Sequence, residues 1–265
     1  MCLGLGLPAV MSTSTFRPAA VTSFTLLECS GMHPGVEVWI CGLERAAELA
    51  ARYLPLLSAD ELERAGRFKF DHLREAYILG RGVTRTILAR RFGADPRALC
   101  FQYSVYGKPS IEGAGQWHFN VSHSGSLLVC ALTEVAPIGV DIERVRRQPK
   151  AAAIAKRFFS AAEAQRVLAA PADSVAAVFS EIWTRKEAFL KATGEGFSRE
   201  LQGFTVSSGP GEIPRLEHIE GPDDDPALWS LRAFVPAESY VGALAVRAPI
   251  GEVLLQRFDP AAVAC

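Results

Sequence analysis

The chain has 265 residues, of which 28 are Lys or Arg and 29 are Asp or Glu, so its formal net charge is −1. With 49% hydrophobic and 22% charged residues, the composition excludes a disordered tail protein and a highly basic nucleic-acid coat. No apolar run reaches the roughly 20 residues that a bilayer crossing needs, so we expect neither a nucleic-acid partner nor a membrane partner.

Residues 1–35 differ in composition from the rest of the chain, because no charged residue precedes Arg17. The apolar stretch near the start lacks the basic lead of a secretory signal. We therefore expect a flexible extension or a mis-assigned start, and a weak export signal is the less favoured alternative. The six cysteines are scattered without CxxC spacing, which favours reduced thiols and a cytoplasmic location.

Helix signals are clear in the next segment, residues 36–149. Ser58 and Glu61 have the spacing of a capping box, which predicts a short helix over 58–67. Apolar residues at spacings of three and four predict a longer amphipathic helix over 73–92, ended by a glycine.

Strand signals surround these helices. A loop is expected over 103–115. Turn residues separate the three strand-like runs that follow this loop, which is the order of a meander. The predicted strands cover residues 36–41, 117–121, 127–133 and 138–142.

The segment 150–250 repeats this order. Ser174 is placed to cap a helix over 175–193 that Gly194 ends. Strand-like runs follow at 204–207, 231–235 and 240–246. The repetition indicates an internal duplication with a boundary near residue 150.

These patterns predict an α+β fold. We expect a pseudo-dimeric, two-lobed arrangement in which each lobe is a small antiparallel sheet packed on a long helix. The lobes would cover 36–149 and 150–250, with a C-terminal tail over 251–265. One continuous mixed sheet is the alternative.

The first chemically informative group is the pair Asp141 and Glu143. Alternate residues of a strand share a face, so both carboxylates point the same way, with Cα atoms roughly 6.6–6.8 Å apart. That spacing lets both side chains reach one cation such as Mg²⁺, whose bonds to oxygen are about 2.1 Å long. Alternatively, the two carboxylates bind no metal, lie at a solvent-exposed strand end and form ion pairs with the arginines that follow.

Two further groups add to this pair. Glu187 and Lys191 share one helix face at i, i+4. They form a stabilising surface pair, or Glu187 is a third metal-binding carboxylate and Lys191 binds a phosphate. Lys108, Ser122 and His123 lie in loop and turn segments and are typical donors to phosphate oxygens. A hydrogen-bonded turn and a Ser–His hydrolase are alternatives for this last group, although the nucleophile motif GxSxG is absent.

The sequence resembles the Sfp-type 4′-phosphopantetheinyl transferases over residues 54–204. The matching runs appear in order and with the spacing of the family: GKPSI, WHFNVSHSG, PIGVDIERV, RFFS and FSEIWTRKEAFLKATGEGF. The resemblance implies a pseudo-dimeric α+β enzyme that moves phosphopantetheine from coenzyme A (CoA) to a serine of an apo carrier protein. Adenosine 3′,5′-bisphosphate would be the other product.

The resemblance also implies residue roles. Mg²⁺, or Mn²⁺ in its place, would be bound by Asp141, Glu143 and Glu187. Lys191 would contact the CoA pyrophosphate. The nucleotide end of CoA would be held by Arg64, Lys108, Ser122 and His123.

Catalysis would involve Glu187 and Lys191, together with Glu163 and Lys186, which match a pair implicated in proton removal from the carrier serine. The general base stays open between this pair and a metal-linked carboxylate or water. A lysine position of the family holds Glu61 here, so that other basic residues, such as Arg67 or Arg74, would have to compensate.

A run of basic residues follows Glu143 without an intervening acid, and it could attract an acidic acyl, peptidyl or aryl carrier. The run comprises Arg144, Arg146, Arg147, Lys150, Lys156 and Arg157. A solvated face is the alternative. We expect a monomer, active in fatty-acid, polyketide or nonribosomal peptide synthesis. A non-catalytic CoA-binding module and a Mg²⁺ phosphohydrolase are the competing functions.

Overall fold

The structure is a computed structural model that describes residues 35–209, 211–221 and 225–263. The expected N-terminal extension lies, apart from residue 35, outside these residues. In the described part, no helix combines the length and the apolar composition that crossing a bilayer requires.

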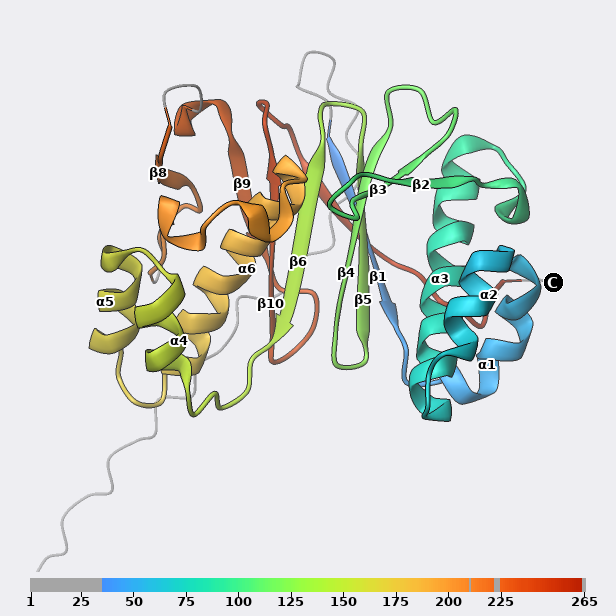
Figure 1. Ribbon diagram of the computed structural model, residues 1–265, viewed down its shortest axis with the longest axis horizontal. Coiled ribbons are helices and arrows are strands. Elements are labelled where there is room, and N and C mark those ends of the chain that lie inside the picture. Colours follow the sequence, from blue (N-terminus) through green and yellow to red (C-terminus); the bar gives the residue numbers. More distant parts are fainter. Residues whose placement is uncertain (1–34, 210, 222–224, 264–265) are drawn as a thin grey trace, which may run out of the picture. The chain divides into compact units, whose positions relative to one another are not determined.

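The elements alternate along the chain as an α+β protein (Figure 1). The α-helices are α1 (Ala46–Tyr53), α2 (Ala59–Gly66), α3 (Asp71–Phe92), α4 (Ala151–Phe158), α5 (Ala161–Ala169) and α6 (Val175–Thr193). The first strands are β1 (Val36–Gly42), β2 (Phe101–Tyr103), β3 (Pro109–Ile111), β4 (His118–Ser124), β5 (Leu127–Thr133) and β6 (Ile138–Arg144). The later strands are β7 (Phe204–Val206), β8 (Leu216–Ile219), β9 (Ser230–Phe234), β10 (Tyr240–Val246) and β11 (Val253–Arg257).

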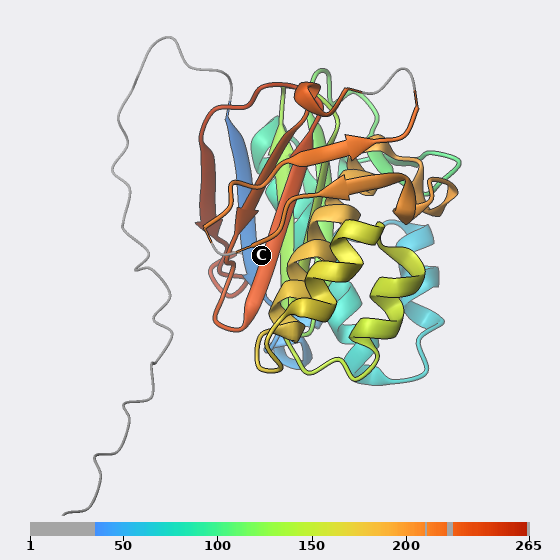
Figure 2. The ribbon, with the colours of Figure 1, turned by 90° about the vertical axis from the view of Figure 1, so that its left-hand side faces the viewer.

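Two main sheets lie between two groups of helices, as Figures 1 and 2 show. The first sheet has the strand order β11-β1-β5-β4, and the second has the order β6-β10-β9. Strands β2–β3 and β7–β8 form separate hairpins. The two-lobed α+β prediction is therefore confirmed, and the alternative of one continuous sheet is wrong.

Three details of the predicted topology change. Strand β6 pairs with β10 and not with β5, so the expected meander is wrong at this step. Strand β11, in the segment expected as a tail, pairs with β1 as the one parallel pair among the described ladders. The boundary near residue 150 stays a prediction, although β6, which precedes it, belongs to the sheet of the second lobe.

Three apolar layers hold this arrangement together. Alternate residues of β1, β5, β6 and β10 form the layer between the two sheets, with Val38, Val129 and Val140 each 0% exposed. The opposite face of the first sheet packs on α1 and α3, and that of the second on α6. Strand β5 is buried along its whole length because apolar layers cover both of its faces.

The helix ends follow the predicted signals. Glu61 accepts a hydrogen bond from the backbone N–H of Ser58, which completes the predicted capping interaction of α2. Gly93 and Gly194 end α3 and α6 in the left-handed conformation, with φ of 63° and 76°. That conformation costs a residue with a Cβ more than it costs glycine.

Gly139 sets the distance between the second sheet and α6. A Cβ at this position would lie 2.0 Å from the carbonyl oxygen of Ala188 and 2.3 Å from the nitrogen of Ala192. Both atoms belong to the backbone of α6. Only glycine therefore lets β6 approach the helix this closely, and this approach brings Asp141 near the α6 residues described next.

Candidate active site

One acidic centre forms where β6 meets α6. Asp141 and Glu143 lie on β6, while Glu187 and Lys191 lie on the face of α6 that approaches it. Val140 and Ile142, which alternate with the two carboxylates, are 0% and 1% exposed in the layer between the sheets. The strand therefore presents its carboxylates and its core residues on opposite faces, as its alternation predicts.

Asp141 is buried at 6% exposure and is the most heavily bonded of the carboxylates. Its Oδ1 accepts hydrogen bonds from Lys191 Nζ at 2.7 Å and from Ser122 Oγ at 2.8 Å. Lys191 Nζ also donates to Ser122 Oγ and to the carbonyl of Val140, each at 3.2 Å. The structure thus brings Asp141, Ser122 and Lys191 into one cluster.

The other two carboxylates lie close enough to influence each other's charge. Burial raises the pKa of Glu187; the charge of Asp141 adds to the rise, Lys191 opposes it, and Glu143 contributes in the same direction as Asp141. Glu143 Oε2 accepts a hydrogen bond from Ser124 Oγ at 2.7 Å. In the described part of the chain, however, no three acidic, histidine or cysteine groups are gathered into a ready metal-binding cluster. Lys191, as the ion-pair partner of Asp141, supplies positive charge at this point instead.

The donor set nevertheless fits a divalent cation. Asp141 Oδ2 and Glu187 Oε1 are buried, and neither has a hydrogen-bond partner among the described residues. Buried polar atoms are almost always satisfied in folded proteins, so two orphaned carboxylate oxygens of one centre call for an explanation. A cation bound by carboxylate oxygens would satisfy both and would favour the charged form of Glu187.

Two adjoining cavities lie near this centre, and the smaller one reaches it. A small one of about 220 Å³ is lined by Glu187, Lys191 and Lys108. A larger one of about 770 Å³ lies between β4 and the helices α2 and α3. Both cavities are lined by Gly107, Pro109 and Val121, so the loop before β3 borders the two of them.

The larger cavity carries basic and aromatic side chains. Arg64 and His123 line it, and the Arg64 guanidinium lies 5.6 Å from the ring centroid of Tyr77. His123 and Ser122 are neighbours on β4 and therefore point to opposite faces. Hence His123 faces the cavity, whereas Ser122 is buried against Asp141. The structure separates these two predicted phosphate donors.

Glu61 does not place a negative charge in the cavity. Its carboxylate is 2% exposed and forms ion pairs with Arg81 and Arg85. Burial alone would raise the pKa of Glu61, but the hydrogen bond from Arg85 and the charge of Arg81 hold it below its usual value. One carboxylate between two guanidiniums leaves a net charge of +1, and Arg81, whose side chain is 18% exposed, lines the cavity.

The two compensating residues suggested by the sequence lie elsewhere. Arg67 pairs with Glu63 and Arg74 pairs with Asp71, and all four side chains are largely exposed. Neither arginine lines the larger cavity.

Lys108 lies at the C-terminal end of α6. Its Nζ donates to the carbonyl oxygen of Ala192 at 2.8 Å, where the helix dipole is negative. Burial lowers the pKa of Lys108 to about 8. This lysine borders the small cavity together with Lys191, in agreement with the phosphate-binding expectation for its position, which stays a prediction.

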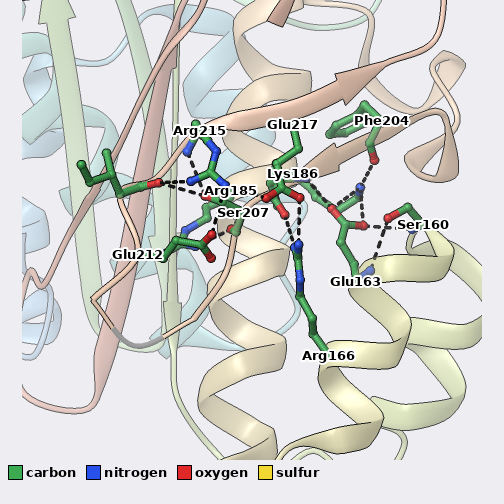
Figure 3. Close-up of polar contacts among 12 residues, drawn as sticks. Ser160, Glu163, Arg166, Arg185, Lys186, Phe204, Ser207, Glu212, Arg215 and Glu217 are labelled. Atoms are coloured by element: carbon green, nitrogen blue, oxygen red, sulfur yellow. Dashed lines mark hydrogen bonds and ion pairs between the residues drawn. The ribbon is translucent and has the colours of Figure 1, made fainter.

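Glu163 and Lys186 form an ion pair inside the second lobe, and Figure 3 shows their contacts. Both side chains are 0% exposed, and Lys186 Nζ donates to Glu163 Oε2 at 2.7 Å. Glu163 also accepts hydrogen bonds from the backbone N–H groups of Ser160 and Val206. The pair ties α5, α6 and β7 together, and a carrier serine has no access to it in this conformation. A role in proton removal therefore rests on the resemblance alone.

The predicted basic run lies on the surface after β6 and along α4. All six residues are exposed, and none forms an ion pair with another described residue; they are Arg144, Arg146, Arg147, Lys150, Lys156 and Arg157. Glu143 and Arg146 line a further cavity of about 290 Å³ beside Trp183. The basic surface therefore begins next to the acidic centre.

Sequence reasoning missed two residues of the site. Ser124 binds Glu143, and its position two residues after Ser122 on the same strand face was an available signal. Arg81 lies on the α3 face toward the larger cavity, but the charge pattern of the helix does not distinguish it from Arg85, which is buried.

Comparisons with known proteins show what the chain is similar to. A family model described as the 4′-phosphopantetheinyl transferase superfamily matches residues 137–245, and one described as 4′-phosphopantetheinyl transferase, N-terminal, matches residues 46–135. The 4′-phosphopantetheinyl transferase HetI of Nostoc sp. is 35% identical over 214 residues, which are 80% of this chain and 87% of the relative. The 4′-phosphopantetheinyl transferase Sfp of Bacillus subtilis is 36% identical over 155 residues, 58% of this chain and 68% of the relative.

Proposed function

The chain belongs to the 4′-phosphopantetheinyl transferase superfamily, and on that premise we propose a Mg²⁺-dependent transfer reaction. Phosphopantetheine would move from CoA to a serine of an apo carrier protein. The products would be the holo-carrier and adenosine 3′,5′-bisphosphate. Mn²⁺ is the alternative metal.

One observation supports the metal above all others. The oxygens Asp141 Oδ2 and Glu187 Oε1 are buried without a hydrogen-bond partner among the described residues, and Glu187 lines the small cavity together with Lys191. Together with Glu143, these residues would hold Mg²⁺. When bound, the ion would stabilise negative charge on the phosphates of CoA.

The larger cavity is our candidate site for the nucleotide end of CoA. Arg64 and His123 line it, and the net +1 of the Glu61–Arg81–Arg85 cluster supplies further positive charge at its wall. We assign the 3′-phosphate to Arg64, Arg81 and His123, and the pyrophosphate to Lys108 and Lys191. The pantetheine end would then point toward the acidic centre.

The chemical step forms a bond between the serine oxygen and the β-phosphorus of CoA. The bond from that phosphorus to the oxygen bridging to the nucleotide breaks, and adenosine 3′,5′-bisphosphate leaves with the electron pair. The serine proton needs an acceptor within hydrogen-bond reach, and Glu187 is our candidate because it lines the small cavity in which the phosphates would lie. Lys191 would stabilise the charge of the leaving phosphate.

The carrier partner is assigned to the basic surface after β6. This surface carries six exposed cations without ion-pair partners among the described residues. They would attract an acidic carrier by long-range electrostatic attraction, which salt weakens. Salt should therefore raise the KM for the carrier more than the KM for CoA. Equal effects on both values would contradict this assignment.

A single experiment separates this function from its competitors. The protein is incubated with CoA, Mg²⁺ and a panel of apo carriers, and each carrier is weighed by mass spectrometry. A mass gain of one phosphopantetheine arm indicates the transferase. CoA cleavage without that gain indicates a phosphohydrolase, and the absence of both indicates a CoA-binding module. The choice among fatty-acid, polyketide and peptide carriers, the monomeric state and the cytoplasmic location stay predictions.

A further inference from the structure

The two main sheets meet at β4 and β6 without a backbone ladder. Side chains of β4 take its place. Asn120 Oδ1 accepts from the backbone N–H of Val140 at 3.0 Å, and Ser122 Oγ accepts from that of Ile142 at 3.3 Å. Ser124 Oγ accepts from the N–H of Arg144 at 3.1 Å. The three β4 side chains therefore accept from the backbone N–H of every second residue of β6 between Val140 and Arg144.

Two of these side chains have a second interaction. Ser122 donates its hydroxyl proton to Asp141 Oδ1 at 2.8 Å, and Ser124 donates its own to Glu143 Oε2 at 2.7 Å. Each serine thus holds one carboxylate and the backbone N–H of the residue that follows it. The same unit occurs twice, two residues apart on both strands. In the third unit, Asn120 faces the amide of Val140, and the preceding residue is Gly139, which has no carboxylate.

We propose that Ser122 and Ser124 are positioning residues that fix Asp141 and Glu143 in the orientation needed for the cation. The inference rests on the proposed function, because it concerns the same metal site. Each serine binds one oxygen of its carboxylate and leaves the other free, and for Asp141 the free atom is the orphaned Oδ2. Hydrogen bonds to ligating carboxylates typically change metal affinity about 10–100-fold when they are lost.

The hydrogen-bond capacity of Ser122 is fully used by groups of the acidic centre and of β6. A hydroxyl has one proton and two lone pairs. Ser122 gives its proton to Asp141, and its lone pairs accept from Ile142 N and Lys191 Nζ. In this arrangement the hydroxyl proton is engaged by Asp141, a role that adds to the phosphate contact that the resemblance implies. His123, on the opposite face of β4, keeps its place at the cavity.

The test compares metal affinity in four full-length proteins: the wild type, Ser124→Ala, Ser124→Thr and Asn120→Ala. Mn²⁺ binding is measured by electron paramagnetic resonance with CoA present, and the free energy of unfolding is measured in urea. We expect Ser124→Ala to weaken Mn²⁺ binding about 10–100-fold, and Ser124→Thr, which keeps the hydroxyl, to restore most of it. Asn120→Ala removes a bond of the same junction without touching a carboxylate. Because Asn120 also lines the small cavity, this control is measured without CoA, where it should lower stability and leave Mn²⁺ affinity unchanged.

A double-mutant cycle checks the route of the effect. If Ser124 acts through Glu143, then Ser124→Ala should have little further effect in a Glu143→Gln background. Wild-type affinity in Ser124→Ala, or an equal loss in Asn120→Ala, would overturn the positioning role while leaving the metal site intact. A wild-type protein that binds no Mn²⁺ in the presence of CoA would refute the proposed metal site itself.

Discussion

Gly139 offers the sharpest test of how the fold positions the site. In Gly139→Ala, the new methyl group would lie 2.0 Å from the Ala188 carbonyl oxygen, whereas real Cβ contacts are not shorter than 3.0 Å. The obstacle is helix backbone, which cannot rotate away, so α6 must move by about 1 Å or more relative to β6. Overpacking of this kind typically costs about 1–3 kcal/mol. At about 2–4 °C per kcal/mol for a protein near this size, Tm should fall by about 2–12 °C.

The same displacement should separate Glu187 and Lys191 from Asp141. A shift of about 1 Å in reacting groups can lower a rate about 100-fold. Transfer to an apo carrier, thermal unfolding and Mn²⁺ binding would be measured together. Gly66→Ala is the matched control, because a Cβ there meets nothing within 4 Å. Wild-type Tm together with wild-type transfer in Gly139→Ala would refute the argument.

Three further changes test single groups. Asp141→Ala should stay folded by circular dichroism yet lose transfer, and near wild-type transfer at saturating Mg²⁺ would remove Asp141 from the site. Because burial lowers the pKa of Lys108 to about 8, the KM for CoA should rise above that pH, and Lys108→Arg, which stays charged, should abolish the rise. The folded protein then binds fewer protons than the unfolded chain between about pH 8 and 10.5, so this group makes stability increase with pH across that interval. Lys186→Met leaves the buried charge of Glu163 without its cation and should cost about 3–5 kcal/mol in urea unfolding. Pairing it with Glu163→Gln should recover part of that loss, and unchanged stability in the single variant would contradict a structural pair.

Local signals predicted the long helices well. The ends of α3 and α6 at Gly93 and Gly194 were predictable because a left-handed glycine stops a helix whatever surrounds it. The partner of β6 was not predictable, since its alternation reports which face is buried and not which strand lies alongside. Helix α5 was missed, although Ser160 and Glu163 repeat the capping box of α2.

The acidic centre was predicted in part for a similar reason. Alternation along β6 placed Asp141 and Glu143 on one face, and helical spacing placed Glu187 beside Lys191. That the two groups approach each other was only one of two alternatives until the family resemblance favoured it, because the approach depends on long-range packing of β6 on α6. The burial of Glu163 and Lys186 likewise depends on long-range packing, here of α5 and β7 on α6, so the spacing of the two residues in the sequence gave no sign of it.

The parallel pairing of β11 with β1 has a consequence for the protein during its synthesis. Strand β1 leaves the ribosome early, whereas its neighbour β11 is made after all the other elements. At translation speeds of about 5–20 residues per second, one edge of β1 waits roughly 10–40 s for its partner. An unpaired edge is a template for aggregation, so nascent chains that stall before β11 should be substrates for chaperones.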